Sequence, residues 1–180
     1  MSFPLTKVLV GPESQRSELF VHQSIITSRS KFFASALSGR WNNCDAKTIN
    51  LYDVNPNLKS EDVEHYLEAV YTNRITFKDN SRVPESVCHL YVIAELLLDL
   101  HARNLAIQAL YEQIRHHKSD EYGPYLYPGP ECIQIVYKGT VSGDLMREYL
   151  LIFGATAEAL LYSSAMICRN GFCVSWRRLR

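Results

Sequence analysis

The sequence lacks an excess of charge of either sign. Nineteen Lys and Arg residues balance nineteen Asp and Glu residues, so the 180-residue chain has a formal net charge of +0 at pH 7. Proteins that bind nucleic acids or anionic membranes by electrostatics carry a basic surface. The balanced composition therefore argues against direct nucleic-acid binding and against membrane attachment as functions of this chain.

Long hydrophobic runs are missing as well. No apolar run approaches the roughly 18 residues that a membrane-spanning helix needs, and the opening residues MSFPLTK contain no apolar core of a signal peptide. The cysteines are few, odd in number and scattered: Cys44, Cys88, Cys132, Cys168 and Cys173. This pattern favours reduced thiols over a disulfide framework. We therefore expect a cytoplasmic or nuclear location.

Motifs of catalysis and metal binding are also missing. The sequence contains no nucleophile elbow, no glycine-rich phosphate loop and no paired His-x-x-x-His zinc motif. Cys168 and Cys173 lack the second ligand pair of a zinc site. His22, at a strand-to-helix junction, is interpreted as a structural histidine. We predict no catalytic residue, no metal and no cofactor, with a cysteine–histidine hydrolase as a minor alternative.

What is present in the first part of the chain predicts short strands. Val8–Val10 and Leu19–Val21 are two β-favouring runs, joined by a polar turn at Gly11–Ser14. Thr48–Leu51 alternates in polarity like a half-buried strand. A small sheet is therefore expected.

Residues 19–39, LFVHQSIITSRSKFFASALSG, carry the strongest local signal of the chain. The strand turns through a histidine into a Ser-Arg-Ser element, after which apolar residues recur at helical spacing and a glycine follows as a stop. The helical positions and the stop are Phe32, Phe33, Ala36, Leu37 and Gly39. The segment predicts a strand followed by two short helices.

Three longer helices are predicted in the middle of the chain. Ser60 offers a capping hydroxyl, and two acidic residues follow it at the positive end of the helix dipole. The apolar positions are Val63, Tyr66, Leu67, Val70 and Tyr71 in the first helix; Val87, Leu90, Tyr91, Ala94, Leu97 and Leu98 in the second; and Leu105, Ala106, Ala109, Leu110 and Ile114 in the third. Ile75–Phe77 is expected to be a short extended piece.

A proline- and glycine-rich stretch beginning at Tyr122 predicts a linker. After it, residues 131–137 fit a strand or a helix, and Pro130 just before them favours the helix. Residues 144–153 and 158–165 are expected to form two further helices.

These motifs occur in the order typical of the BTB/POZ domain, which the chain resembles from about Lys7 to His116. The first half matches at Val21-His22, Ile26, Ser28-Arg29-Ser30, Phe32-Phe33, Gly39-x-Trp41 and Ile49-x-Leu51. The second half matches at Tyr66-Leu67, Val70-Tyr71-Thr72, residues 90–95, Asp99-Leu100 and residues 104–110. Residues 131–165 are similar to the helical extension of many fungal BTB proteins.

The chain also departs from that family pattern. The residues before the first strand are Leu5-Thr6-Lys7, where the family usually has an aspartate, and few residues precede them. The acidic group that lines the dimer groove of some transcriptional BTB domains is also missing. The missing aspartate and the short segment before the strand weaken the inference of a swapped homodimer, so dimerisation stays an expectation.

The resemblance implies a protein–protein interaction module. BTB domains can pair with themselves, and they can dock on the cullin scaffold of a RING ubiquitin ligase as substrate adaptors. By resemblance, the docking residues are Tyr71, Thr72, Asn73, Phe77, Arg103 and Asn104. Tyr71 and Phe77 are the expected aromatic anchors. The alternative is a dimerising scaffold, or a transcription-associated assembly module, with no ligase role.

The expected fold class is α+β: a small sheet of short strands with a cluster of helices, followed by a helical extension. The expected domains are a BTB/POZ domain at residues 5–116, a linker at 117–130 and the extension at 131–180. The expected partners are proteins, with a cullin and a second copy of this chain as the candidates.

Overall fold

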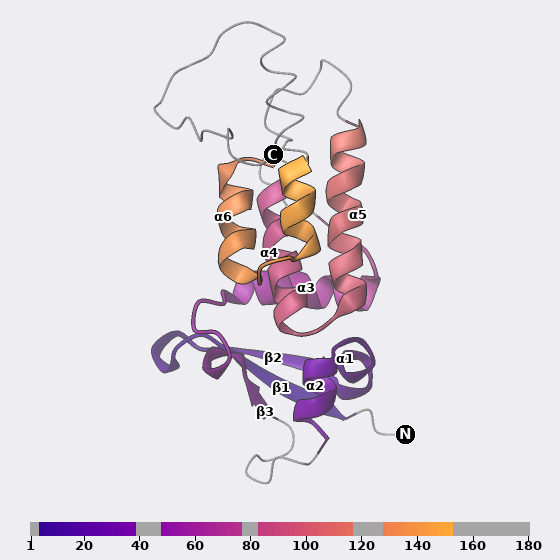
Figure 1. The fold of residues 1–180 in the computed structure, drawn as a ribbon. Helices are drawn as coiled ribbons and strands as arrows, with labels where there is room; N and C mark the ends of the chain where they lie inside the picture. Colours follow the sequence, from indigo (N-terminus) through magenta and orange to yellow (C-terminus); the bar gives the residue numbers. More distant parts are fainter. Residues whose placement is uncertain (1–3, 39–47, 77–82, 117–127, 153–180) are drawn as a thin grey trace, which may run out of the picture.

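A three-stranded sheet forms the base of the molecule (Figure 1). In this computed structural model, the structure describes residues 4–38, 48–76, 83–116 and 128–152. Strand β1 (Leu5–Val10) lies in the centre, antiparallel to β2 (Ser17–His22) and parallel to β3 (Thr48–Asn50). A 3-10 turn, η1 (Glu13–Gln15), joins β1 to β2. The predicted sheet and its turn are confirmed.

The register of the sheet places one apolar face toward the helices. Val8 pairs with Leu19 on one side and with Ile49 on the other. Alternate residues of β1, including Val8 and Val10, are fully buried, whereas Phe20 on β2 is exposed. Side chains of a strand alternate between its faces, so the opposite face of the hairpin looks toward solvent.

Two short helices, α1 (Gln23–Arg29) and α2 (Lys31–Ala36), follow β2 as the sequence predicts. Ser30 separates them and caps α2, because its hydroxyl accepts the backbone N–H of Phe33 at 3.1 Å. The same hydroxyl donates to the carbonyl of Leu97 at 2.5 Å. The expected stop at Gly39 lies outside the described residues.

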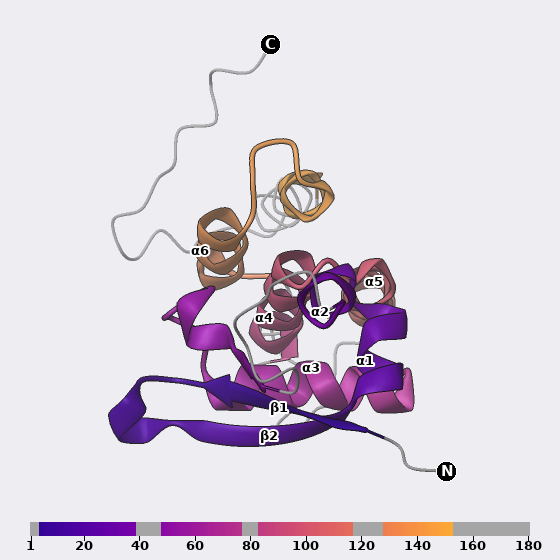
Figure 2. The same ribbon diagram turned by 90° about the horizontal axis from the view of Figure 1, so that it is seen from below.

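Three longer helices lie above the sheet in Figure 1: α3 (Ser60–Thr72), α4 (Val83–Leu96) and α5 (Leu100–His116). Figure 2, seen from below, shows the β1–β2 hairpin in front of α3. A 3-10 turn, η2 (Leu51–Asp53), leads from β3 toward α3. The prediction that Ser60 caps α3 is wrong: Lys59 holds the N-cap position and makes no side-chain capping bond, and Ser60 is the first helical residue.

A further correction concerns α4, and the extended piece expected before it is described only in part. Leu98, predicted as part of the apolar stripe of this helix, lies beyond its end with φ 54° and is 53% exposed. The backbone reverses at Leu98 so that α5 can begin at Leu100. Ile75 and Thr76 belong to no helix or strand, and Phe77 lies outside the described residues.

The apolar side chains gather in two clusters. The first cluster joins the sheet, α1, α2 and α3, with Val8, Phe33 and Tyr66 among its fully buried members. The second cluster joins α4 and α5 to α6 (Pro130–Gly139) and to a last helical segment, residues 145–152. Burial of such side chains contributes about 1.5–3 kcal/mol each. The carboxyl-terminal helices therefore share a core with α4 and α5.

Helix α6 packs closely on α4. A methyl group added at Gly139 would lie 2.2 Å from Cγ1 of Val92, so only glycine allows this approach. Pro130 occupies the start of α6, which confirms helix over strand at residues 131–137. The predicted helix at 144–153 is confirmed as residues 145–152, and the one at 158–165 lies outside the described residues.

The observed elements confirm the predicted α+β class: a small three-stranded sheet with a larger set of helices. In the part of the chain that the structure describes, no helix is long and apolar enough to cross a membrane.

Candidate interaction surface

The end of α3 is held in a fixed conformation by its own side chains. Asn73 follows the helix in the left-handed region with φ 55°, and its N–H donates to the carbonyl of Ala69 at 3.0 Å. Asparagine tolerates this region better than most residues. The Thr72 hydroxyl lies 2.8 Å from the carbonyl of Glu68 and 3.0 Å from that of Arg74. The turn at 72–74 is therefore well defined.

Tyr71 stands at the edge of this turn with 44% of its side chain exposed. Its hydroxyl accepts the backbone N–H of His22 at 2.8 Å and lies 2.9 Å from Nδ1 of the same residue. The two rings meet edge to face, with centroids 5.9 Å apart. Tyr71 thus ties the end of α3 to the start of α1. His22 has the structural partner that the sequence analysis expected.

The start of α5 lies beside the end of α3. Nε2 of His101 hydrogen-bonds to the side-chain oxygen of Asn73. Asn104, one turn after Leu100 on the same side of α5, is exposed, and Leu100 itself is 64% exposed. We define the α3–α5 surface as Tyr71, Thr72, Asn73, Leu98, Leu100, His101 and Asn104.

A buried aspartate fixes the start of α5 from beneath. Asp99 is fully buried and caps the helix by accepting the N–H of Ala102 at 2.9 Å. It also accepts the hydroxyl of Tyr66 at 3.1 Å, and Nε of Arg29 lies 3.5 Å from it. Burial first, and then the negative charge of Asp99, raise the pKa of Tyr66. The phenol therefore stays protonated and donates to Asp99, which joins α1, α3 and α5.

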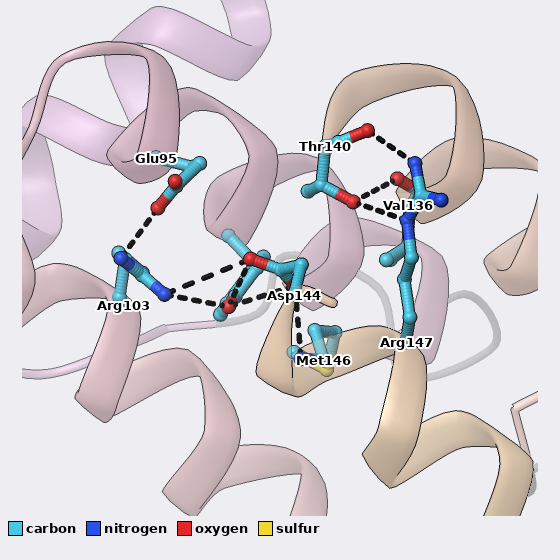
Figure 3. A network of polar contacts seen from close by, with 8 residues as sticks. Glu95, Arg103, Val136, Thr140, Asp144, Met146 and Arg147 are labelled. Carbon is cyan, nitrogen blue, oxygen red and sulfur yellow. Dashed lines mark hydrogen bonds and ion pairs between the residues drawn. The ribbon is translucent and has the colours of Figure 1, made fainter. Parts of the chain in front are cut away.

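Arg103, predicted as a docking residue, points into a second polar network (Figure 3). Its guanidinium lies 2.6 Å from Glu95, donates to the hydroxyl of Tyr91 at 3.1 Å, and is 3.6 Å from Asp144. Burial alone would lower the pKa of Arg103, but Tyr91 and the two carboxylates outweigh it and raise the pKa. Arg103 therefore serves as an internal link, and its part in docking stays a prediction.

Asp144 connects that network to the carboxyl-terminal helices. It caps residues 145–152 by accepting the N–H of Met146 at 2.9 Å, and each of its oxygens accepts from Tyr91 at 3.0 Å. Burial is the largest cause of a raised pKa at Tyr91. The network therefore joins α4 and α5 to the last helical segment.

Arg147 fixes the turn between α6 and residues 145–152. It donates to the hydroxyl of Thr140 at 2.9 Å and to the carbonyl of Tyr137 at 2.9 Å, and its guanidinium lies over the Tyr137 ring at 4.5 Å. Figure 3 shows Arg147 and Thr140 side by side near Asp144.

The α3–α5 surface combines exposed apolar side chains with exposed polar ones. Exposed apolar side chains lie next to asparagine, histidine and threonine, which can form a polar rim. Within the described residues, no group of three or more metal-ligating side chains occurs.

Four of the six predicted docking residues are exposed on the two segments that the Asn73–His101 hydrogen bond joins: Tyr71, Thr72, Asn73 and Asn104. Phe77 lies outside the described residues. The sequence analysis missed Leu98, Leu100 and His101 as surface residues. Their apolar or helical surroundings gave no sign of exposure. Leucine is also rare in the left-handed region, so the sequence does not predict a turn at Leu98.

A protein-family model matches the part of the chain from β1 to α5. The model of the BTB/POZ domain matches residues 7–116. No curated protein matches the chain. BTB domains mediate protein–protein interaction, and the matched segment covers more than half of the sequence, from β1 to the end of α5. The chain therefore belongs to the BTB/POZ domain family.

Proposed function

We propose that this chain is a substrate adaptor of a cullin-RING ubiquitin ligase and that it docks on the cullin through the α3–α5 surface. Membership of the BTB/POZ family supports an interaction module. The observation that carries the finer proposal is the contact between Asn73 and His101. It joins the two segments where the family resemblance predicts cullin docking.

The composition of the α3–α5 surface suits such a partner. Leu98 is 53% exposed and Leu100 is 64% exposed, so two apolar side chains face solvent close to each other at the start of α5. Hydrogen bonds hold the surface in place through Asn73 and Tyr71. A preorganised apolar centre with a polar rim reduces the entropic cost of association.

An adaptor needs a second surface for its substrate, and we assign it to the extension after residue 130. The fungal type of the extension and a cytoplasmic or nuclear location belong to the same proposal. The extension shares a core with α4 and α5, so substrate bound there would be held rigidly relative to the docking surface.

The test is a calorimetric titration of the full chain with the amino-terminal domain of a cullin from the same organism. We expect a dissociation constant in the micromolar range or tighter, about −8 kcal/mol or better. The decisive variant is Leu100→Glu, which places a charge on the surface at the first residue of α5, where an acidic side chain stabilises the helix. We expect it to abolish binding and to leave folding intact.

The matched control is Val141→Glu, which adds the same charge at a 70% exposed valine between α6 and residues 145–152. It should bind the cullin as the wild type does. Equal loss in both variants would place the effect in net charge and not in the surface. Phe77→Asp tests one of the two aromatic anchors expected from the sequence, and unchanged binding would show that Phe77 is not an anchor. No heat with the wild type at several temperatures would overturn the adaptor proposal, and sedimentation velocity would then test the dimerising scaffold.

A further inference from the structure

Strand β2 forms one edge of the sheet, because the strand order is β2-β1-β3. Its residues pair with β1 in an unbroken antiparallel register, so the strand carries no bulge. Its sequence, SELFVH, contains neither proline nor lysine, the residues that commonly protect an edge strand from another chain. Phe20 in the second half of the strand is 60% exposed. The edge is therefore regular enough to receive a further strand.

Two hydrogen bonds at the end of β2 show which of its backbone groups face the open edge. The N–H of Gln23 donates to the carbonyl of Pro4 on the β1 side at 3.0 Å. The N–H of His22 points the other way and donates to the hydroxyl of Tyr71 at 2.8 Å. In an antiparallel pair, successive residues direct their N–H and C=O groups alternately toward and away from the partner strand. The backbone groups of the even-numbered residues of β2 therefore face the open edge.

Glu18 and Phe20 each present one N–H and one C=O at that edge. Within the described residues, none of these groups has a hydrogen-bond partner. Tyr71 closes the edge after them, because its hydroxyl already holds the N–H of His22. A strand that pairs here must offer the same donors and acceptors in the reverse order. A second copy of β2, related by a two-fold axis, offers this arrangement.

We propose that two copies of this chain pair through their β2 strands, antiparallel and around a two-fold axis at Leu19. In this register Glu18 of each copy exchanges both backbone hydrogen bonds with Phe20 of the other copy. A pairing centred on Phe20 would instead need the N–H of His22, which Tyr71 already holds. The Tyr71 hydroxyl therefore selects the register. The two three-stranded sheets become one continuous sheet.

The side chains on both faces of β2 fit this pairing. On the face toward the helices, Leu19 is half-buried and would lie directly opposite Leu19 of the second copy. On the outer face, the two Phe20 rings come within diagonal reach of each other. Each Glu18 keeps its ion pair with Lys7 at 2.8 Å, which limits repulsion between the two carboxylates across the axis. The pairing therefore covers apolar surface without leaving a carboxylate unpaired at the axis.

The first test is sedimentation velocity of the full chain over a concentration series from about 5 to 500 μM. Such a short pairing gives a small interface, so we expect a dimer with a dissociation constant of about 10–100 μM. Glu18→Pro removes an N–H at the open edge and leaves the ladder to β1 intact. It should keep the circular dichroism spectrum and stay monomeric. The matched control, Glu18→Ala, loses the same carboxylate but keeps the N–H, and it should dimerise as the wild type does.

A cross-link tests the register. The background keeps only the buried Cys88 and Cys132, and the other cysteines are replaced by serine. Leu19→Cys should form a disulfide-linked dimer on mild oxidation with diamide, because directly opposite residues of this kind lie about 4.5 Å apart between Cα atoms. Ser17→Cys, on the same face of β2, should not cross-link, because residue 17 of one copy lies opposite residue 21 of the other.

A wild type that stays monomeric throughout the concentration series would overturn the proposal. So would a folded Glu18→Pro variant that still dimerises, or a Leu19→Cys variant that cross-links no better than Ser17→Cys. The two copies would then associate through a surface other than the β2 edge.

Discussion

Two buried aspartates in this protein make the same set of contacts, one inside the family domain and one at its border with the extension. Asp99 caps α5, accepts from Tyr66 and pairs with Arg29. Asp144 caps residues 145–152, accepts from Tyr91 and pairs with Arg103. In each case a helix start is fixed by one carboxylate, one phenol and one guanidinium from three separate segments.

The difference between the two sites lies in what remains when the aspartate is removed. Arg29 pairs with Asp99 at 3.5 Å and otherwise donates to the carbonyl of Val70. Arg103 keeps a second carboxylate, Glu95, at 2.6 Å. Loss of Asp99 therefore leaves a guanidinium facing a neutral interior, whereas loss of Asp144 leaves one that is still paired. We call the contacts of Asp99 the inner site and those of Asp144 the outer site. The inner site should control the folding of the domain, and the outer site should control the attachment of the extension.

The largest expected effect is that of Asp99→Asn. The amide keeps the shape of the carboxylate but leaves Arg29 without a counter-charge in a buried site. We expect the free energy of unfolding to fall by about 3–5 kcal/mol, measured by urea denaturation followed by circular dichroism. A loss below about 1 kcal/mol would mean that the Val70 carbonyl and solvent satisfy Arg29 without Asp99.

Asp144→Ala should have a smaller and more local effect. Glu95 still neutralises Arg103, so we expect a loss of about 2–3 kcal/mol from the missing cap and the unsatisfied hydroxyl of Tyr91. Amide hydrogen exchange should become faster in α6 and residues 145–152 and stay unchanged in α1 and α2. The matched control is Glu148→Ala, an exposed carboxylate on the same segment. Faster exchange throughout the domain would contradict the division between the two sites.

The sequence predicts the inner site better than the outer one. The helix expected at 144–153 begins at Asp144, whereas the apolar repeat of the third helix is seen only from Leu105 onward. Asp99 lies within the segment that resembles the family, whereas Asp144 lies outside that segment. Asp144 pairs with Tyr91, which is 53 positions earlier in the sequence. Periodicity finds helices and their apolar faces. It carries no signal for a polar contact between segments far apart in the sequence.

The same limit applies to the α3–α5 surface. Resemblance placed Tyr71 and Asn73 correctly at the end of α3, and the apolar pattern then assigned Leu98 to a buried stripe. A left-handed residue at the end of α4 moves Leu98 outward. Such a turn depends on tertiary contacts of the loop backbone, among them the bonds from Ser30 and from the Lys31 N–H to the carbonyls of Leu97 and Leu98.

Gly139→Ala tests how the packing of α6 on α4 contributes to the attachment of the extension. The added methyl would lie 2.2 Å from Val92, so α6 must shift away from α4. We expect a loss of about 1–2 kcal/mol, since overpacking is partly offset by the better helix propensity of alanine. Adding Val92→Ala should recover most of it in a double-mutant cycle. Additive losses would show that the clash is relieved elsewhere.

The smallest expected effect is a difference between Tyr66 and Tyr91 in how each changes the free energy of unfolding at alkaline pH. Burial raises the pKa of Tyr66 and of Tyr91 above the ordinary value of 10.0. A phenol with a raised folded-state pKa contributes stability that is fully present below pH 10.0 and is lost as the pH rises toward the folded-state pKa, because the unfolded chain releases the proton first. The free energy of unfolding should therefore fall above about pH 10, by up to about 1.4 kcal/mol per pH unit for each such group.

Tyr66→Phe should flatten that fall over the whole alkaline range, since the folded-state pKa of Tyr66 is raised far above its ordinary value. Tyr91→Phe should flatten it over a narrower interval, because hydrogen bonding to Arg103 stabilises the phenolate and opposes the effect of burial. Urea denaturation at pH 8 and at several values above pH 10 measures both slopes. Identical slopes in the two variants would mean that Arg103 is committed to Glu95 and Asp144 and leaves Tyr91 unaffected. The inner and outer sites would then differ in the partners of their arginines and not in the environment of their phenols.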